Sequence, residues 1–192
     1  MSSTTTTNTT NPMVKLIGLL TIIAGVVMIV AGGATWGLVT TQLKAEQITV
    51  AAVSEAAPGS LAGKQVAGPF TAYAQANAIK EHSLLAGEGK TYAQIGDESK
   101  AVKAKLAANG VSDADQAKDA DVVKLAGERT TVMNGSFLRA SLFTSVIAYG
   151  IAALVIGLGI LFGLLGFALR SISTTTVLTS APVLGKPVGA GV

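Results

Sequence analysis

The stretch LIGLLTIIAGVVMIVAGGATWGLV, residues 16–39, and the stretch LFTSVIAYGIAALVIGLGILFGLLGFAL, residues 142–169, decide the fold of this chain. Neither stretch contains a charged residue. A helix needs about 20 residues to cross a hydrocarbon core of about 30 Å, and both stretches exceed that length. The sequence therefore predicts two transmembrane helices.

The residues that flank the two stretches are typical of membrane interfaces. Lys15 precedes the first stretch, Trp36 lies near its far end, and an arginine stands on either side of the second. A cleaved signal peptide is the alternative for the first stretch, but the apolar part of such a peptide usually has about 7–15 residues. We expect the spans at residues 15–41 and 140–170.

The chain between the spans, residues 42–139, is predicted to form one small polar domain. The whole chain has 192 residues, of which 13% are charged, and a mean hydropathy of +0.54. From Thr41 to Arg139 there are eleven Lys and Arg and eleven Asp and Glu, so the net charge of +3 arises outside this segment. A balanced domain of this kind has no electrostatic surface for nucleic acid, and we expect no nucleic-acid partner.

The two ends of the chain are polar and of low complexity. Residues 1–14 begin MSSTTTTNTTNP, and residues 171–192 are rich in Ser, Thr, Pro and Gly. Such segments cannot bury a core, so both are predicted to be disordered tails.

Within the domain the pattern indicates helices separated by glycine. One helix is predicted at 70–85 after Pro69, then a short element at 90–95 that ends at Gly96, and a second helix at 97–108. Ser112 is a candidate cap for a third helix that reaches about Met133. Asn134-Gly135 is expected to kink or interrupt it, with Ser136 as the cap of the helix that follows. The fold class is thus a mainly α membrane protein: a two-helix antiparallel transmembrane hairpin with an inserted small helical extracytoplasmic domain.

Glycines recur at regular spacing in both spans. Gly18, Gly25 and Gly32 are seven residues apart, and the second span contains Gly159-x-x-x-Gly163. Lipid provides no hydrophobic force between helices, so small residues that allow close backbone approach favour helix association. We interpret the first set as the contact between the two spans, with a further glycine face free to meet another helix. The alternative is that glycine is simply common in membrane helices.

The expected topology follows from the even number of spans and from charge. Two spans place both termini on one side of the membrane. The excess positive charge of the tails favours the cytoplasm for the termini and the outer side for the domain, although the charge rule is weak for long loops.

The sequence contains few candidates for catalytic, metal-binding or phosphate-binding residues. The chain has no cysteine and one histidine, His82, which we interpret as structural. The acidic cluster Asp113, Asp115, Asp119 and Asp121 does not have the pattern of a calcium loop. The segment 87–91 contains Gly-Lys-Thr but lacks the first glycine of a phosphate-binding loop. We predict no catalytic, cofactor-binding or metal-binding residue and no cofactor.

Three phrases resemble a known family: GKQVAGPFTAYAQANAIKEHSLLAGEGKTYAQI at 63–95, SFLRASLFTSVIAYGIAALVIGLGILF at 136–162, and TTQLKAEQITV at 40–50. They resemble small actinobacterial two-span membrane proteins that are often labelled "aromatic ring-opening dioxygenase" in genomes. Such an enzyme needs an iron site with two histidines and a carboxylate, which His82 alone cannot supply, so we judge the label erroneous. The resemblance implies an actinobacterial plasma membrane and carries no site residues.

The sequence therefore favours a non-enzymatic integral membrane protein: an accessory, scaffolding or assembly subunit of an envelope or membrane complex. The expected partners are the lipid bilayer and other membrane proteins or further copies of the chain. The alternative is a lipid or small-ligand binding or sensing module, with a pocket lined by Phe70, Tyr73, Tyr92 and Ile95. An enzyme that uses His82 is a third hypothesis.

Overall fold

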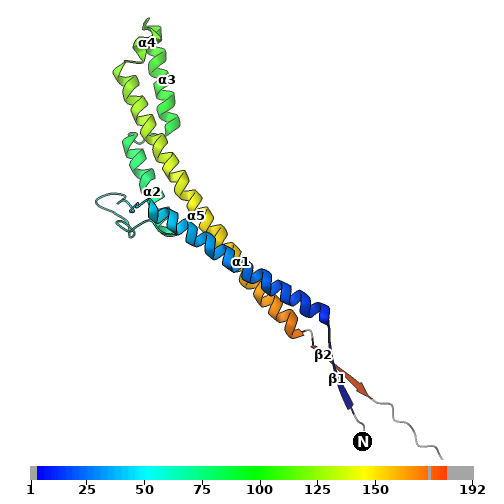
Figure 1. Cartoon of the computed structure of the whole chain (residues 1–192). Coiled ribbons are helices and arrows are strands. Elements are labelled where there is room, and N and C mark those ends of the chain that lie inside the picture. The colour runs from blue at the N-terminus through cyan, green and yellow to red at the C-terminus, as the bar shows by residue number, and fades with distance from the viewer. Residues whose placement is uncertain (1–3, 173, 181–192) are drawn as a thin grey trace, which may run out of the picture. The chain divides into compact units, whose positions relative to one another are not determined.

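The computed structural model describes residues 4–172 and 174–180 and is mainly helical, as the sequence predicts (Figure 1). The elements in chain order are β1 (Thr4–Thr10), α1 (Pro12–Ala45), α2 (Pro69–Ala86), α3 (Tyr92–Ala108), α4 (Asp113–Gln116), α5 (Ala120–Ile172) and β2 (Thr174–Ser180). The chain forms two compact units. The first contains residues 1–33 and 154–192, the second contains residues 34–153, and α1 and α5 run through both.

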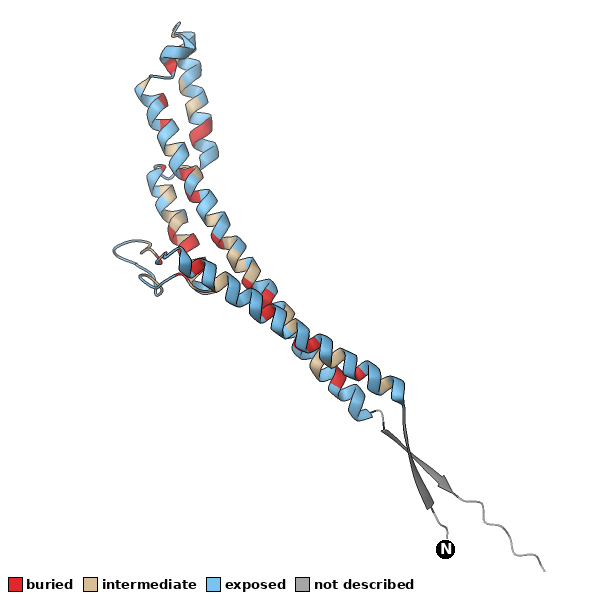
Figure 2. Ribbon diagram, in the orientation of Figure 1, coloured by how far each residue is buried: buried red, intermediate tan, exposed pale blue. Residues whose placement is uncertain are grey.

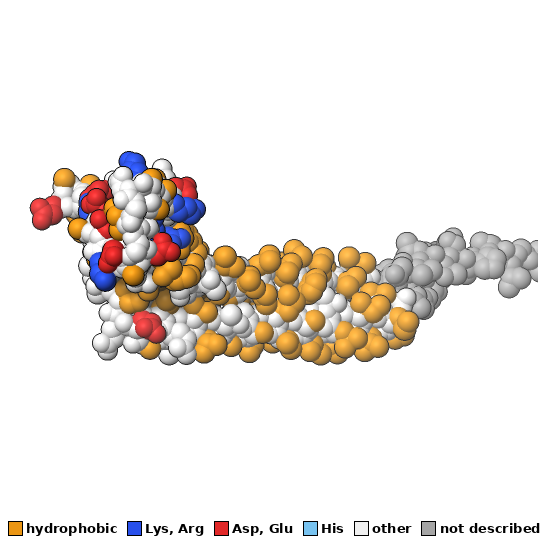
Figure 3. Space-filling view, turned by 90° about the horizontal axis from the view of Figure 1, so that it is seen from above, with side chains coloured by type: hydrophobic (Ala, Val, Ile, Leu, Met, Phe, Trp, Pro, Cys, Tyr) orange, Lys and Arg blue, Asp and Glu red, His pale blue; other side chains and the backbone are white. Residues whose placement is uncertain are grey.

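Two helices of the described chain, α1 and α5, are long and apolar enough to cross a membrane. In the most apolar 18-residue window of each, only 11% of α1 and 17% of α5 is buried. The helices are therefore apolar on the outside, which a helix in the core of a soluble protein is not. Figure 2 shows their surfaces as mostly exposed, and Figure 3 shows hydrophobic side chains covering them.

In the first unit, α1 and α5 approach each other at glycines. A Cβ atom on Gly25 would lie 2.5 Å from the carbonyl oxygen of Gly159 and 2.9 Å from the amide nitrogen of Gly163. A Cβ atom on Gly18 would lie 2.8 Å from the carbonyl oxygen of Gly166. The later glycine of α1 thus meets the earlier glycine of α5. These backbone contacts leave no room for any other side chain.

Two short strands lie near the ends of the described chain. β1 and β2 pair antiparallel from Thr4 with Ser180 to Thr10 with Thr174. Both are rich in threonine, a β-branched residue that favours strands. The rest of both predicted disordered tails, residues 1–3, 173 and 181–192, lies outside the described residues.

In the second unit, α2 matches the helix predicted at 70–85, but the next helix begins earlier than predicted. The Thr91 hydroxyl accepts a hydrogen bond from the Gln94 amide at 3.4 Å, and α3 runs from Tyr92 without interruption. The predicted break at Gly96 is therefore wrong. Gly96 lies inside α3 and is buried, and a Cβ atom there would contact the Arg129 guanidinium at 3.4 Å.

The predicted interruption at Asn134-Gly135 is also wrong, because α5 continues through it. Gly135 allows Ser83 of α2 to pack against the α5 backbone, in the space that a Cβ atom would occupy. Ser136 is not a cap: its hydroxyl donates to the carbonyl oxygen of Val132 at 3.0 Å, within the helix. Ser112 does cap a helix, but only the single turn of α4.

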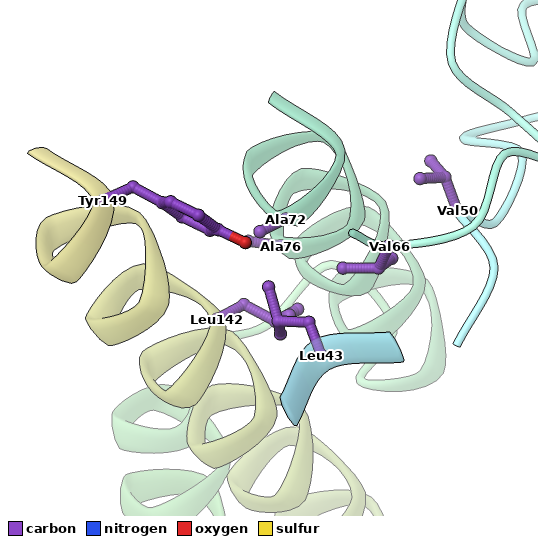
Figure 4. Close-up of a cluster of buried hydrophobic side chains, with 7 residues drawn as sticks. All are labelled: Leu43, Val50, Val66, Ala72, Ala76, Leu142 and Tyr149. Atoms are coloured by element: carbon purple, nitrogen blue, oxygen red, sulfur yellow. The ribbon is translucent and has the colours of Figure 1, made fainter. Parts of the chain in front are cut away.

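The second unit has two apolar clusters. One joins the end of α1, the loop between α1 and α2, α2 and α5 (Figure 4), through Leu43, Val50, Val66, Ala72, Ala76, Leu142 and Tyr149. The other joins α3 to α5 through Ile95, Leu125 and Val132. In the loop between α1 and α2, Thr49 pairs with Gln65 in an isolated antiparallel bridge.

Candidate functional site

A buried tyrosine connects α5 to the end of α1 and to the loop between α1 and α2. Tyr149 is 1% exposed, and its hydroxyl lies 2.8 Å from the Thr40 hydroxyl. It also donates to the carbonyl oxygen of Ala67 at 3.4 Å, and its ring meets Trp36 edge to face, with ring centroids 4.7 Å apart. A buried hydroxyl needs such partners, so this group positions segments of the second unit relative to one another.

His82 holds the loop that precedes α2. Its Nε2 atom lies 2.9 Å from the carbonyl oxygen of Ala52. A carbonyl oxygen only accepts, so Nε2 carries the proton and donates. The side chain of the buried Gln75, two turns earlier on the same face of α2, accepts a hydrogen bond from the Ala51 amide at 2.7 Å. Both side chains thus fix the same loop to α2, which supports the structural interpretation of the histidine.

The acidic cluster does not converge on one point. Asp115 pairs with Lys118 at 3.2 Å and accepts from the Ser112 hydroxyl at 2.7 Å, and these hydrogen bonds, that of Ser112 first, lower its pKa. Asp119 accepts from the Asp121 amide at 3.0 Å, at the start of α5. Among residues 4–172 and 174–180 no three or more His, Cys, Asp or Glu side chains are grouped so as to hold a metal ion.

A network of charges connects the turn after α2 with α3 and α5. Lys90 pairs with Glu98 at 2.5 Å, and Lys124 pairs with Glu88 at 2.6 Å and with Glu128 at 3.4 Å. The hydrogen bond between Lys124 and Glu88 lowers the pKa of the Glu88 carboxyl and raises that of the Lys124 ammonium. The segment 87–91 is thus a turn held by ion pairs.

A cavity of about 360 Å³ lies where α2, the start of α3 and α5 meet. Its lining combines two cations, four hydroxyl groups and small or apolar residues: Lys80, Ser83, Leu84, Thr91, Tyr92, Ala93, Val132, Gly135, Ser136 and Arg139. No carboxylate is among these described lining residues. Gly135 and Ser83, which bring α2 close to α5, are both part of this lining.

Arg139 is the most unusual group in this lining. Its guanidinium lies over the Phe143 ring, 5.1 Å from the ring centroid. Its Nε atom is buried and makes no hydrogen bond in the described part of the chain. A buried donor without a partner costs about 1–3 kcal/mol, so an acceptor at this position would stabilise the structure. Lys80 pairs only with the neighbouring Glu81, at 3.6 Å on the surface, among described residues.

The four residues suggested for a ligand pocket do not lie together. Phe70, which is 80% exposed, and Tyr73 line a separate groove of about 340 Å³ along the loop 50–62. Tyr92 lines the cavity between α2, α3 and α5, and Ile95 is fully buried in the core. Sequence reasoning missed that Lys80 and Arg139 line one cavity, because 58 residues separate them in the sequence and they share this lining only through the packing of α2 and α5.

Comparison with protein-family models, with curated proteins and with solved structures found no match to this chain. The resemblance to actinobacterial two-span membrane proteins therefore stays a prediction.

Proposed function

We propose that this chain is a two-pass integral plasma-membrane protein without enzymatic activity, which serves as an accessory, scaffolding or assembly subunit of a membrane or envelope complex. The observation that carries the proposal is the exposure of α1 and α5. Both are strongly apolar, yet only 11% and 17% of their most apolar windows is buried. Exposing this much apolar surface to water is unfavourable, whereas lipid solvates it.

The membrane arrangement we propose is an antiparallel hairpin of the two spans. The glycine contacts of Gly18 and Gly25 with α5 support it, since close backbone approach is a main source of helix association in lipid. The domain between the spans lies on the outer side and both termini lie in the cytoplasm. The three positive charges outside the balanced central segment favour this orientation.

A second glycine face on α5 supports the subunit role. Gly150 and Gly157 are exposed, and a Cβ atom on either would meet no heavy atom within 4 Å. At 100° per residue, Gly157 lies about 200° around α5 from Gly159, which contacts α1. Glycines on one side of α5 thus allow the close approach of α1, while glycines on the other side are open, and a helix of another membrane protein can pack against them.

The test is affinity purification from membranes in mild detergent, with the bound proteins identified by mass spectrometry. Gly157→Leu fills the open face without a clash inside the chain, and we expect it to reduce recovery of the partner several-fold. Ile151→Phe adds bulk at an exposed position about 120° away on the same helix and serves as the control. A chain released from membranes by alkaline carbonate contradicts the membrane proposal, and a chain recovered alone in every mild detergent contradicts the subunit role.

A further inference from the structure

We propose that the start of α2 makes a third contact with the membrane, in which Phe70 and the uncharged surface around it meet lipid in the headgroup layer, next to the acyl chains. This inference rests on the proposed membrane insertion and goes beyond it, because α2 belongs to neither span. Every residue on which it depends lies in the second unit, residues 34–153. Four observations support it: the register of α2 on α5, the level at which charges end, the depth of the interfacial aromatic rings, and the exposed surface around Phe70.

Two contacts define the register of α2 on α5. Ser83 of α2 packs against Gly135 of α5, in the space that a Cβ atom would occupy. Tyr73 of α2 meets Phe143 of α5 edge to face, with ring centroids 5.8 Å apart. The earlier contact on α2 is the later contact on α5, so the two helices run in opposite directions, and the start of α2 lies toward the span.

Phe70 therefore lies at a level where α5 has already entered its uncharged run. It precedes Tyr73 by three residues, which places it beside Val146 when the register is continued. Val146 is four residues, or about 6 Å, beyond Leu142, where the run begins. Figure 4 shows Tyr149, further along the same run, still lying against the first turns of α2.

The charged residues of the three neighbouring helices end at one level, outside the level of Phe70. α2 has no charged residue before Lys80, and α5 has none in the 30 residues that follow Arg139. Lys80 and Arg139 line the same cavity, so these two limits coincide. On α1, Lys44 is at a similar level, since its neighbour Leu43 shares an apolar cluster with Leu142 of α5.

The interfacial aromatic rings give the depth. The ring of Trp36 meets that of Tyr149, and amphipathic rings of this kind prefer the headgroup level of a bilayer. Val146 precedes Tyr149 by three residues, so Phe70 lies about 4.5 Å outside this pair. The headgroup layer is about 5–7 Å thick, so Phe70 lies within it. The loop before α2 is suited to the same layer, because irregular backbone is not stable against hydrocarbon.

The surface around Phe70 is apolar and continues onto α5. Phe70 is 80% exposed, and beside it a groove of about 340 Å³ is lined by Tyr73 and the loop 50–62, with no charged residue among its described lining. Tyr73 contacts Phe143, and the exposed Ile147 follows Phe143 by one turn on nearly the same side of α5. The surface of Phe70 is thus continuous with a side of the span that lipid covers, which favours lipid as its partner.

The test uses single introduced cysteines that carry a spin label, in the full chain reconstituted alone into phosphatidylcholine nanodiscs. The chain has no cysteine of its own. Phe70→Cys reports on the proposed contact, and Ile147→Cys reports on the span at the same level. Leu85→Cys is the matched control, because Leu85 is 73% exposed on the same helix and lies fifteen residues, or about 22 Å, further from the span.

The readout is the collision of each label with oxygen, which concentrates in lipid, and with a nickel chelate, which stays in water. We expect the ratio of oxygen to nickel collisions to be several-fold higher at Phe70→Cys and Ile147→Cys than at Leu85→Cys. All three side chains are exposed, so the substitutions leave the packing of the chain unchanged.

A second measurement keeps an aromatic ring at the contact. Phe70→Trp is made in a Trp36→Phe background, so that the new indole is the only one in the chain. Brominated phosphatidylcholine, which quenches indole fluorescence on contact, should quench this variant several times more strongly than Leu85→Trp in the same background.

The outcomes separate this inference from the membrane proposal. A label in lipid at Ile147→Cys with a label in water at Phe70→Cys overturns the third contact and leaves the two spans standing. Labels in water at both positions overturn both proposals. A Phe70→Cys label shielded from both reagents shows that protein, as in a second copy of the chain, covers the surface in place of lipid. Equal quenching of Phe70→Trp and Leu85→Trp also overturns the contact.

Discussion

Gly25 on α1 allows close contact with the backbone of α5 because it has no side chain. The nearest atoms to an added Cβ belong to the α5 backbone, which cannot move aside as a side chain can. Gly25→Ala therefore has to separate the helices, and we expect it to destabilise the chain by about 1–3 kcal/mol, as overpacking does. Unfolding in mixed micelles of mild detergent and SDS measures this difference.

The control lies eight residues further along the same helix. Gly33 is exposed, and an added Cβ would meet no heavy atom within 4 Å. Gly33→Ala makes the same chemical change and should leave stability unchanged or slightly higher, since alanine favours helix over glycine. Equal stability of the two variants would mean that Gly25 is not at a close helix contact.

Other glycines show why residue patterns misplace helix ends. Gly96 and Gly135 each have a polar neighbour in the sequence. A glycine in such a position is usually interpreted as the end of a helix. In the structure both lie inside helices, Gly96 under Arg129 and Gly135 against Ser83. The partner side chain that makes each glycine useful lies on another helix, so nothing in the local sequence distinguishes a contact glycine from a terminating one.

At the scale of elements, ion pairs hold the turn after α2 to α3 and α5, and their contribution depends on pH. The pKa of Glu88 in the folded protein lies below its ordinary value of 4.5, chiefly because Lys124 hydrogen-bonds its carboxylate. A carboxyl with a lowered pKa stabilises the fold fully above the unfolded value, and this contribution is lost as pH falls through the folded value. The raised pKa of Lys124 makes its contribution disappear only at alkaline pH above 10.5.

We therefore expect the contribution of Glu88 and Lys124 to the thermal stability of the full chain in detergent to stay constant near pH 7. Below about pH 4.5 the stability should decrease. The decrease should be small and salt-sensitive, because the groups are exposed. Glu88→Gln should lower stability at pH 7 and flatten the acid decline. Asp97→Asn, which breaks an isolated exposed pair with Lys100, should change neither; an identical acid decline in wild type and Glu88→Gln contradicts this account.

At the scale of the whole molecule, the sequence predicts what depends on composition and misses what depends on packing between distant segments. The two candidate spans and α2 could be read from apolar runs and a helix-starting proline. The cavity could not, because its lining comes from α2, α3 and α5, and these helices come together through contacts such as that of Ser83 with Gly135. The predicted pocket of Phe70, Tyr73, Tyr92 and Ile95 failed for the same reason, since aromatic content does not tell which helix face each ring occupies.

The proposed topology can be tested directly because the chain contains no cysteine, so any introduced thiol is labelled without background. Ala104→Cys places a thiol on an exposed position of α3 in the second unit, and Ser3→Cys places one near the amino terminus. We expect a membrane-impermeant maleimide to label Ala104→Cys in intact cells and Ser3→Cys only after lysis. The reverse pattern would invert the proposed orientation. Labelling of both positions in intact cells contradicts a two-span arrangement, because two spans place residue 3 on the side opposite to residue 104.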